Sequence, residues 1–318
     1  MEMRIESLAR RAAAGAMAAL TGALTLANPS LAHVGAQATR TDPPPGKLVD
    51  VAGRRMHIRC VGPVNGAPTV ILEAGGGAFS SSWDRVQELL APRVRSCAYD
   101  RAGLGWSEPG PVPRTMRQEA YELHELLNTA HVARPVVLVG HSIGGINVRV
   151  YAERHASDVA GMVLVDPTHE SAVLYNTRLG RWARIRELAT GRAVPEPRAE
   201  GKPAAGYDPA TDYFADELQA VFEARRANPQ PLGERPLFVL AAGRRPPPPG
   251  TSDSLWSELK REKEAQVLDL ASLSRDARFV VDSTSGHQIP SENPALVARS
   301  IEAVVEAVRT GSRLGGRW

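Results

Sequence analysis

Residues 136–145 read Val-Val-Leu-Val-Gly-His-Ser-Ile-Gly-Gly, and the interpretation of the whole chain starts from them. Four consecutive apolar residues, mostly β-branched, predict a strand buried on both faces, which runs directly into the pattern Gly-x-Ser-x-Gly. Gly140 and Gly144 leave room for a turn so sharp that it pushes the hydroxyl of Ser142 outward. The following helix has free amides at its N-terminus, that of Ile143 first, where an oxyanion would form. The stretch therefore predicts a reactive serine at the end of a strand.

The rest of the chain alternates short apolar runs with amphipathic segments. Strands are predicted over 46–51, 54–61, 69–72, 94–99, 136–139, 162–165, 236–240 and 278–281. Helices are predicted over 81–92, 116–130, 143–155, 252–273 and 294–308. Alternation of this kind predicts an α/β protein with a mostly parallel sheet and helices on both of its faces.

A triple glycine follows the predicted strand at 69–72, within the sequence Glu-Ala-Gly-Gly-Gly at residues 73–77. Glycine lets the backbone approach a ligand closely and present an amide to it. We expect the amide of Gly76 to be the second oxyanion donor beside that of Ile143. A plain flexible turn is the alternative interpretation of the same glycines.

Residues 1–38 differ in composition from the rest of the chain. Arginines precede an Ala-rich apolar run from residue 12 to residue 27, and small residues follow it. This order predicts a secretory signal peptide and export to the periplasm or the medium, with an uncleaved anchor as the alternative. Export would put Cys60 and Cys97 in an oxidising compartment where they can pair, although two buried free thiols fit the sequence equally well.

The segment 167–235 lacks clear strands and is rich in Pro, Arg and Ala. An insertion of this length just after a strand end near the serine predicts a cap or lid over the site, with a helix over 215–227. Leu179, Trp182 and Ile185 share one helical stripe, which would either line a pocket or pack the cap onto the core. The core then comprises 39–166 and 236–310, between the signal peptide and a flexible tail at 311–318.

Composition sets further limits on function. The chain has 318 residues, is 43% hydrophobic and 23% charged, and carries a net charge of +3, as ordinary globular proteins do. Its basic residues are spread without interleaved aromatics, which argues against a nucleic-acid partner. His169 and Glu170 are too few ligands for zinc, so we expect neither a metal nor a cofactor. Glu73 and Asp100 are interpreted as loop anchors.

Three motifs together resemble the α/β-hydrolase superfamily, and in particular its capped esterase and haloperoxidase-like members. They are Gly-His-Ser-Ile-Gly at 140–144, Asp-Arg-Ala-Gly-Leu-Gly-Trp-Ser at 100–107 and Ser-Gly-His at 285–287. The resemblance covers about residues 46–310 apart from the cap, and it implies an eight-stranded sheet in which only the second strand is antiparallel. It also places the second and fourth strands side by side. Because the two cysteines fall on those strands, the resemblance favours a disulfide.

The resemblance further implies a triad of serine, acid and histidine in that chain order. Ser142 and His287 carry over directly, and His287 would take the serine proton as a neutral imidazole. The activity that the resemblance implies is that of a serine hydrolase, which cleaves a small-molecule carboxylic ester through an acyl-enzyme. The same machinery would also serve a lactonase or a perhydrolase, and a non-catalytic ligand-binding protein on this fold is the alternative from another class.

The acid is where this sequence departs from the family pattern. Members commonly place it after the seventh strand, but residues 241–245 read Ala-Ala-Gly-Arg-Arg and hold no carboxylate. Asp166, at the end of the sixth strand, lies on the strand beside the serine's own, and some members use that position. We therefore expect Asp166 to be the acid, ahead of Asp253 and then Asp282.

Overall fold

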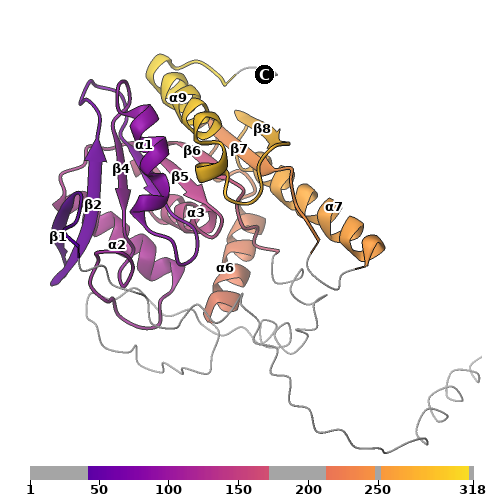
Figure 1. Cartoon of the computed structure of the whole chain (residues 1–318), viewed down its shortest axis with the longest axis horizontal. Coiled ribbons are helices and arrows are strands. Elements are labelled where there is room, and N and C mark those ends of the chain that lie inside the picture. Colours follow the sequence, from indigo (N-terminus) through magenta and orange to yellow (C-terminus); the bar gives the residue numbers. More distant parts are fainter. Residues whose placement is uncertain (1–41, 172–212, 248–251, 315–318) are drawn as a thin grey trace, which may run out of the picture. The chain divides into compact units, whose positions relative to one another are not determined.

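A computed structural model gives the fold (Figure 1). It describes residues 42–171, 213–247 and 252–314. The described residues all belong to one compact unit. The predicted signal peptide, most of the predicted cap and its apolar stripe lie outside the described residues.

The described residues form one eight-stranded sheet, which confirms the predicted fold class. Its strands are β1 (Lys47–Val51), β2 (Arg54–Val61), β3 (Val70–Glu73), β4 (Ser96–Tyr99), β5 (Val136–His141), β6 (Val159–Val165), β7 (Leu237–Ala242) and β8 (Ala277–Asp282). Their spatial order is β1-β2-β4-β3-β5-β6-β7-β8. Strand β2 runs antiparallel to both of its neighbours, and every other neighbouring pair is parallel, as the resemblance implies.

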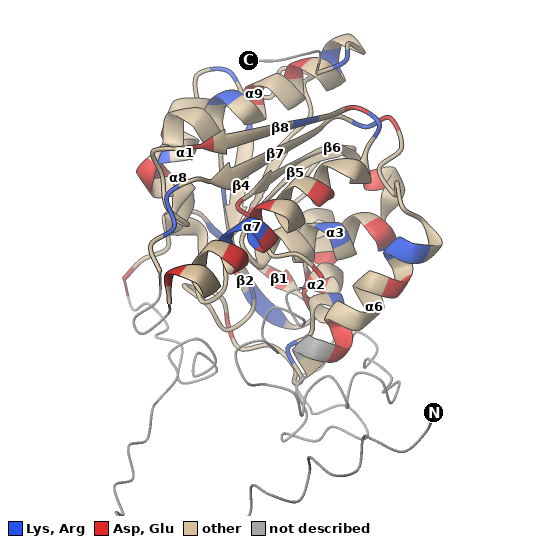
Figure 2. Ribbon diagram, turned by 90° about the vertical axis from the view of Figure 1, so that its right-hand side faces the viewer, with Lys and Arg blue, Asp and Glu red and all other residues tan. Residues whose placement is uncertain are grey.

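Helices cover both faces of this sheet (Figure 2). They are α1 (Asp84–Leu90), α2 (Met116–Thr129), α3 (Gly144–Arg154), α6 (Tyr213–Ala227), α7 (Asp253–Asp269), α8 (Ile289–Glu292) and α9 (Pro294–Thr310). Helices α2, α3, α6 and α7 pack on one face, and α1, α8 and α9 pack on the other. Figure 2 also shows basic and acidic residues interspersed over the helices. None of the helices within the described ranges combines the length and apolarity needed to cross a membrane.

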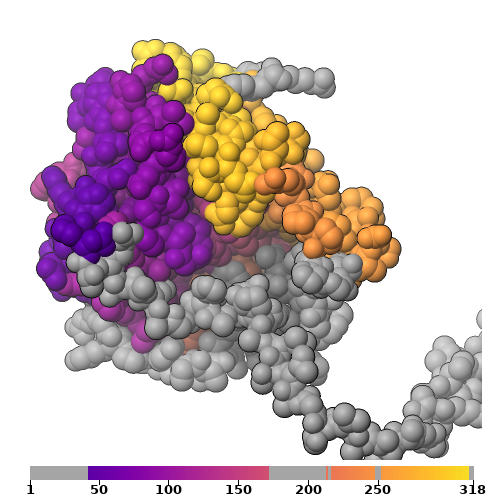
Figure 3. All heavy atoms as spheres, in the orientation of Figure 1, coloured from indigo at the N-terminus to yellow at the C-terminus, as the bar shows by residue number. Residues whose placement is uncertain are grey.

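Strand β5 shows why the sheet needs both helical layers. Val136 and Leu138 belong to the core on the α2 and α3 side, whereas Val137 and Val139 belong to the core on the α1 and α9 side. Successive side chains of a strand point to opposite faces, so a strand that is apolar at every position must be covered twice. The space-filling view shows α9, in yellow, lying against the purple surface of the N-terminal half (Figure 3).

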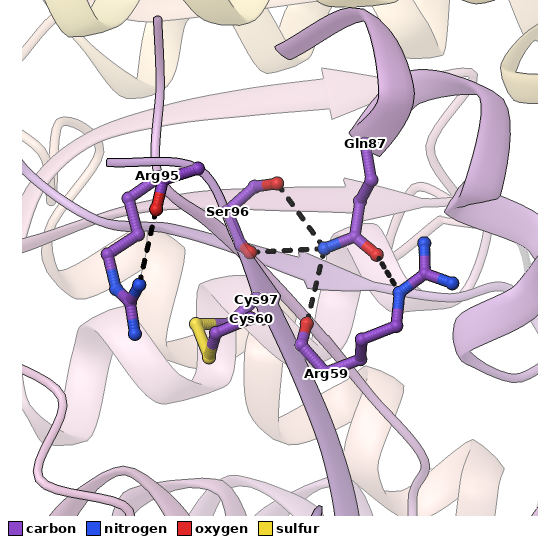
Figure 4. The surroundings of a disulfide bond; sticks show 7 residues. Arg59, Cys60, Gln87, Arg95, Ser96 and Cys97 are labelled. Atoms are coloured by element: carbon purple, nitrogen blue, oxygen red, sulfur yellow. Dashed lines mark hydrogen bonds between the residues drawn. A yellow bond between two sulfur atoms is a disulfide. The ribbon is translucent and has the colours of Figure 1, made fainter. Parts of the chain in front are cut away.

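A disulfide joins Cys60 of β2 to Cys97 of β4, which are directly paired positions in the sheet. The predicted bridge is thus confirmed. Beside it, the buried Gln87 of α1 donates its side-chain amide to the backbone carbonyl oxygens of Arg59 and Ser96 (Figure 4). The bridge and this amide tie the same two strands together.

Replacing both cysteines by alanine is expected to lower the free energy of unfolding by about 2–4 kcal/mol, because the bridge restricts the unfolded chain. The loop that it closes spans a sequence separation of 37 residues. Urea denaturation of wild type and variant measures the difference. Thiol titration of denatured, unreduced protein is the control, and two free thiols there would contradict the bridge.

The residues directly after α9 were predicted to belong to a flexible tail, but Leu314 among them is packed. Gly311 ends the helix with φ = 67°, a left-handed conformation that glycine adopts without strain. Leu314 is only 8% exposed, and its amide donates to the carboxylate of Asp276 at 3.0 Å. At Leu314, therefore, a buried apolar side chain and a hydrogen bond to a buried carboxylate hold the backbone of the segment that was predicted as a flexible tail over 311–318. Residues 315–318 lie outside the described ranges.

Candidate active site

The predicted site residues all follow the carboxyl ends of strands. Parallel strands finish at the same edge of a sheet, so the loops after them meet although they are far apart in sequence. Ser142 follows β5, Asp166 follows β6 and His287 lies in the loop after β8. The loop after β3 carries Gly76 to the same edge, because β3 pairs with β5.

Ser142 occupies the tight turn between β5 and α3, with φ = 55°. This left-handed conformation is uncommon for a residue with a side chain. The turn depends on its glycines: a Cβ at Gly140 would lie 2.4 Å from the carbonyl oxygen of Gly144. A Cβ at Gly144 would lie 2.6 Å from the carbonyl oxygen of Ala74. The steric requirement predicted from the sequence is confirmed.

His287 lies between Ser142 and Asp166. Its Nε2 is 3.0 Å from Oγ of Ser142, and its Nδ1 is 2.6 Å from Oδ2 of Asp166. A carboxylate only accepts hydrogen bonds, so Nδ1 carries the proton and Nε2 of the neutral ring is left with its lone pair. The hydroxyl of Ser142 can therefore donate to Nε2.

Asp166 is fully buried and still ionised. Burial alone would raise the pKa of its carboxyl group, but the hydrogen bond from His287 and the positive charges of Arg245 and Lys263 outweigh burial. The pKa of Asp166 consequently lies below its ordinary value. Its second oxygen, Oδ1, accepts from the amide of Ala242 at 3.1 Å and from the guanidinium of Arg245. Asp166 thus faces the imidazole as a carboxylate held from both sides.

The other two candidate acids lie elsewhere. Asp253 is the exposed first residue of α7, and no hydrogen bond joins it to His287 among the described residues. Asp282 accepts hydrogen bonds from Thr284 and from the side-chain amide of Asn293. Burial raises the pKa of Asp282, but these hydrogen bonds outweigh it and lower that pKa to about 2. The structure therefore brings Asp166, and neither of the alternatives, against the histidine.

Gly76 and Ile143 lie next to each other beside the serine. A Cβ at Gly76 would be 3.4 Å from Cγ2 of Ile143, and both residues line a cavity of about 190 Å³. Among the backbone hydrogen bonds of the described loops and turns, neither amide is a donor. Within the described part of the chain, both N–H groups thus lack a backbone acceptor, as an oxyanion site requires.

Arg101 holds the glycine loop in place, and sequence reasoning did not identify it. This buried side chain donates to the carbonyl oxygens of Ala74 and Gly75, each at 2.7 Å, and pairs with Glu73. Glu73 also accepts from the side-chain amide of Asn147 on α3 at 3.0 Å. The expected anchoring role of Glu73 is confirmed. The available signal was the position of Arg101 inside the motif at 100–107.

His141 contacts the backbone of the loop that carries His287. Its Nε2 is 2.8 Å from the backbone carbonyl oxygen of His287, and the two rings are 4.8 Å apart. Burial, together with the neighbouring His287, lowers the pKa of His141 to about 4. At neutral pH His141 is therefore uncharged and donates its Nε2 proton to that carbonyl, which fixes the backbone of the loop.

His169 and Glu170 belong to an ion cluster with Asp269, and an arginine lies at its centre. Nη1 of Arg225 is 3.2 Å from Nε2 of His169, 2.6 Å from Glu170 and 2.6 Å from Asp269. The guanidinium occupies the position that a metal ion would need among these three side chains. The cluster connects α6 and α7 to the segment after β6.

Comparison with known proteins identifies the family of this fold. The model of the "Alpha/beta hydrolase family" matches residues 70–300. "Lipase LipV" of Mycobacterium tuberculosis is 30% identical over 280 residues, which cover 82% of this chain and 98% of the lipase. A thermophilic esterase from Thermogutta terrifontis has a similar fold, with a TM-score of 0.51, 21% identity and coverage of 80% and 94% of the two chains.

One relative is matched only in part. A probable transporter from Hormonema carpetanum, efuK, is 36% identical over 129 residues, and the match covers 39% of this chain. The matched segment makes up just 18% of that relative's length. The match to the family model, by contrast, runs over residues 70–300, from the start of β3 into α9. The chain belongs to the alpha/beta hydrolase family.

Proposed function

We propose that the protein is a serine hydrolase that cleaves small-molecule carboxylic esters. The observation that carries this proposal is the line of contacts from Ser142 through His287 to Asp166, at 3.0 Å and 2.6 Å. A hydroxyl, an imidazole and a buried carboxylate in this order form the constellation that makes a serine nucleophilic. The family membership supports the same assignment.

In the acylation step, Oγ of Ser142 attacks the ester carbonyl carbon while its proton moves to Nε2 of His287. Asp166 stabilises the imidazolium that forms, through the hydrogen bond to Nδ1. The negative charge on the carbonyl oxygen is held by the amides of Gly76 and Ile143. The tetrahedral intermediate then expels the alcohol, which takes the proton from His287, and an acyl-serine remains.

Deacylation repeats the sequence with water. His287 removes a proton from the water, whose oxygen attacks the acyl carbon of the ester on Ser142. The same two amides hold the second oxyanion. When this intermediate collapses, the proton returns from His287 to Oγ, the carboxylic acid leaves and the free serine is restored. One ester and one water thus give one acid and one alcohol.

The cavity beside the amides of Gly76 and Ile143 supports the proposal that the acyl group of the ester binds in it. His287 must reach the leaving oxygen, so the alcohol lies on the histidine side, and the acyl group extends past Gly76 and Ile143. The cavity that these two line, about 190 Å³, is also bordered by the charged side chains of Arg114 and Glu119. A long hydrocarbon chain would have to displace water from those charges, which is costly.

A panel of p-nitrophenyl esters tests the proposal. We expect kcat/KM for the acetate and butanoate to exceed that for the palmitate by about tenfold or more, because a short chain leaves the charged groups hydrated. Rates from the release of p-nitrophenol under matched detergent conditions give the comparison. No hydrolysis of any ester would contradict the function, and a preference for palmitate would contradict the short pocket.

The alternative of a non-catalytic binding protein is disfavoured by the same contacts. Ser142 and Asp166 are both present, and each lies within hydrogen-bond distance of a ring nitrogen of His287. The disulfide between Cys60 and Cys97 supports the further proposal that the protein is exported, since such bridges persist in oxidising compartments.

A further inference from the structure

The loop after β7 brings a cation against Asp166. The guanidinium of Arg245 donates to Oδ1 of Asp166, the carboxylate oxygen that does not bond to His287. The side chain of Arg245 is 15% exposed, and that of Asp166 is fully buried. An ion pair so shielded from water is stronger than one on the surface and is less screened by salt.

Arg245 lies in the loop where the family resemblance leads one to expect the acid. The family resemblance places the acid after the seventh strand, and in this chain that loop holds Arg244 and Arg245. The carboxylate lies instead at the end of β6, and the loop after β7 supplies its counter-charge. Acid and loop remain adjacent because β6 and β7 are paired, and the amide of Ala242 also donates to Oδ1 at 3.1 Å.

Charged groups of α7 and α8 lie near the pair of Asp166 and His287. Glu292 of α8 accepts from the amide of Gly286, next to His287, at 2.9 Å. Lys263 of α7 donates to the carbonyl oxygen of Pro167 at 2.8 Å. Burial lowers the pKa of Lys263 to about 8, although the negative charge of Asp166 counteracts it. From β5, His141 is neutral at that pH. Protonating His287 would therefore add a positive charge beside Arg245 and, below about pH 8, beside Lys263 as well.

We propose that Arg245 is a positioning residue of this active site, which fixes the carboxylate of Asp166 and opposes protonation of His287. The inference rests on the proposed serine-hydrolase function. An imidazole that already carries a proton cannot accept the one from Ser142, so activity falls as the pH falls. Because Arg245 makes that protonation less favourable, it extends activity to lower pH. Removing the cation must move the acidic limb of the pH profile upward.

The test is the pH dependence of p-nitrophenyl acetate hydrolysis and of inactivation by a fluorophosphonate, in wild type and three variants. Arg245→Gln is expected to raise the midpoint of the acidic limb by about one pH unit, with about a tenfold loss on the acidic side. On the alkaline side of the profile, its rate should stay within about threefold of wild type. Arg245→Lys, which keeps the charge, should restore the wild-type midpoint.

Arg244→Gln is the matched control. Arg244 precedes Arg245 in the same loop, but its side chain is 66% exposed and pairs with Glu292. Its variant should give the wild-type profile at every pH, since an exposed pair contributes little. Circular dichroism and thermal unfolding establish that each variant is folded. If Arg245→Gln does not fold, the test rests on Arg245→Lys alone. A shifted midpoint of the acidic limb in that variant would then contradict the proposed role of the positive charge.

Two further results would overturn the inference. An Arg245→Gln profile that superimposes on wild type would show that the cation does not act on His287. A loss of equal size at every pH would show a merely structural role. Failure of the proposed function looks different: wild type would neither hydrolyse the ester nor react with the fluorophosphonate at any pH, whereas failure of this inference leaves wild type active and Ser142→Ala inactive.

Discussion

Ser142→Ala is expected to lower kcat for p-nitrophenyl acetate by about 10⁴- to 10⁶-fold, because alanine has no oxygen to attack the carbonyl. The amides of Gly76 and Ile143 remain in the variant, so any residual hydrolysis comes from water held against the oxyanion site. Folding should be unaffected, since the turn keeps both of its glycines. The measurement is steady-state kinetics with circular dichroism as the folding check.

Ser291→Ala is the control for this variant. Ser291 is an exposed serine of α8, whose hydroxyl donates to the backbone carbonyl of Gln288. Its activity should remain within about twofold of wild type, as is usual for a surface substitution. If Ser142→Ala kept a tenth of the wild-type rate or more, the serine would not be the nucleophile.

Asp166→Asn is expected to lower kcat by about 10³- to 10⁴-fold, because an asparagine amide no longer selects the tautomer that leaves Nε2 free. In the present structure, Oδ2 of Asp166 accepts the Nδ1 proton of His287 at 2.6 Å. Asparagine can present its N–H₂ group to that nitrogen instead, which puts the proton on Nε2 and blocks transfer from the serine. The loss should appear in kcat more than in KM.

Asp253→Asn is the matched comparison, because Asp253 is the alternative acid suggested by the sequence. It is exposed at the start of α7, and its substitution should leave kcat within about twofold of wild type. The reverse pattern, with Asp166→Asn active and Asp253→Asn inactive, would reassign the acid and imply a different arrangement of the loop before α7.

The sheet could be predicted because its signals are local and repeated. Residues 136–139 are apolar at every position, as a strand covered on both faces requires, and β5 is observed at Val136–His141. The helix predicted over 252–273 is observed as α7 followed by a 3₁₀ turn at Leu270–Leu273. The short helix α8 was not predicted, because four residues carry too little periodicity.

The site was predictable only where a residue follows a strand. Ser142 and Asp166 could be placed from strand ends, whereas the contact of Arg245 with Asp166 joins residues 79 positions apart in two loops without periodic pattern. The same limit applies to Arg101, whose partners are backbone carbonyl oxygens of another loop. The contacts of charged side chains in loops depend on tertiary packing, so local sequence propensity does not predict them.

The docking of α6 illustrates this limit in the predicted cap. A helix over 215–227 was predicted, and α6 is observed at Tyr213–Ala227. Its Glu217 accepts hydrogen bonds from the amides of Met116 and Arg117, at 2.6 Å and 3.0 Å, where α2 begins. Free amides at a helix N-terminus attract a carboxylate, but the sequence does not say which one will reach them.

Covalent labelling tests the central claim most directly. The folded protein is incubated with a fluorophosphonate, digested and analysed by mass spectrometry for the modified residue. We expect a single phosphonyl adduct on Ser142, formed rapidly at neutral pH and slowed strongly in Asp166→Asn, because the hydroxyl reacts only when the imidazole removes its proton. The claim would be contradicted if Ser142 stayed unmodified in folded protein. It would also be contradicted if an adduct formed on another residue and ester hydrolysis was lost with it.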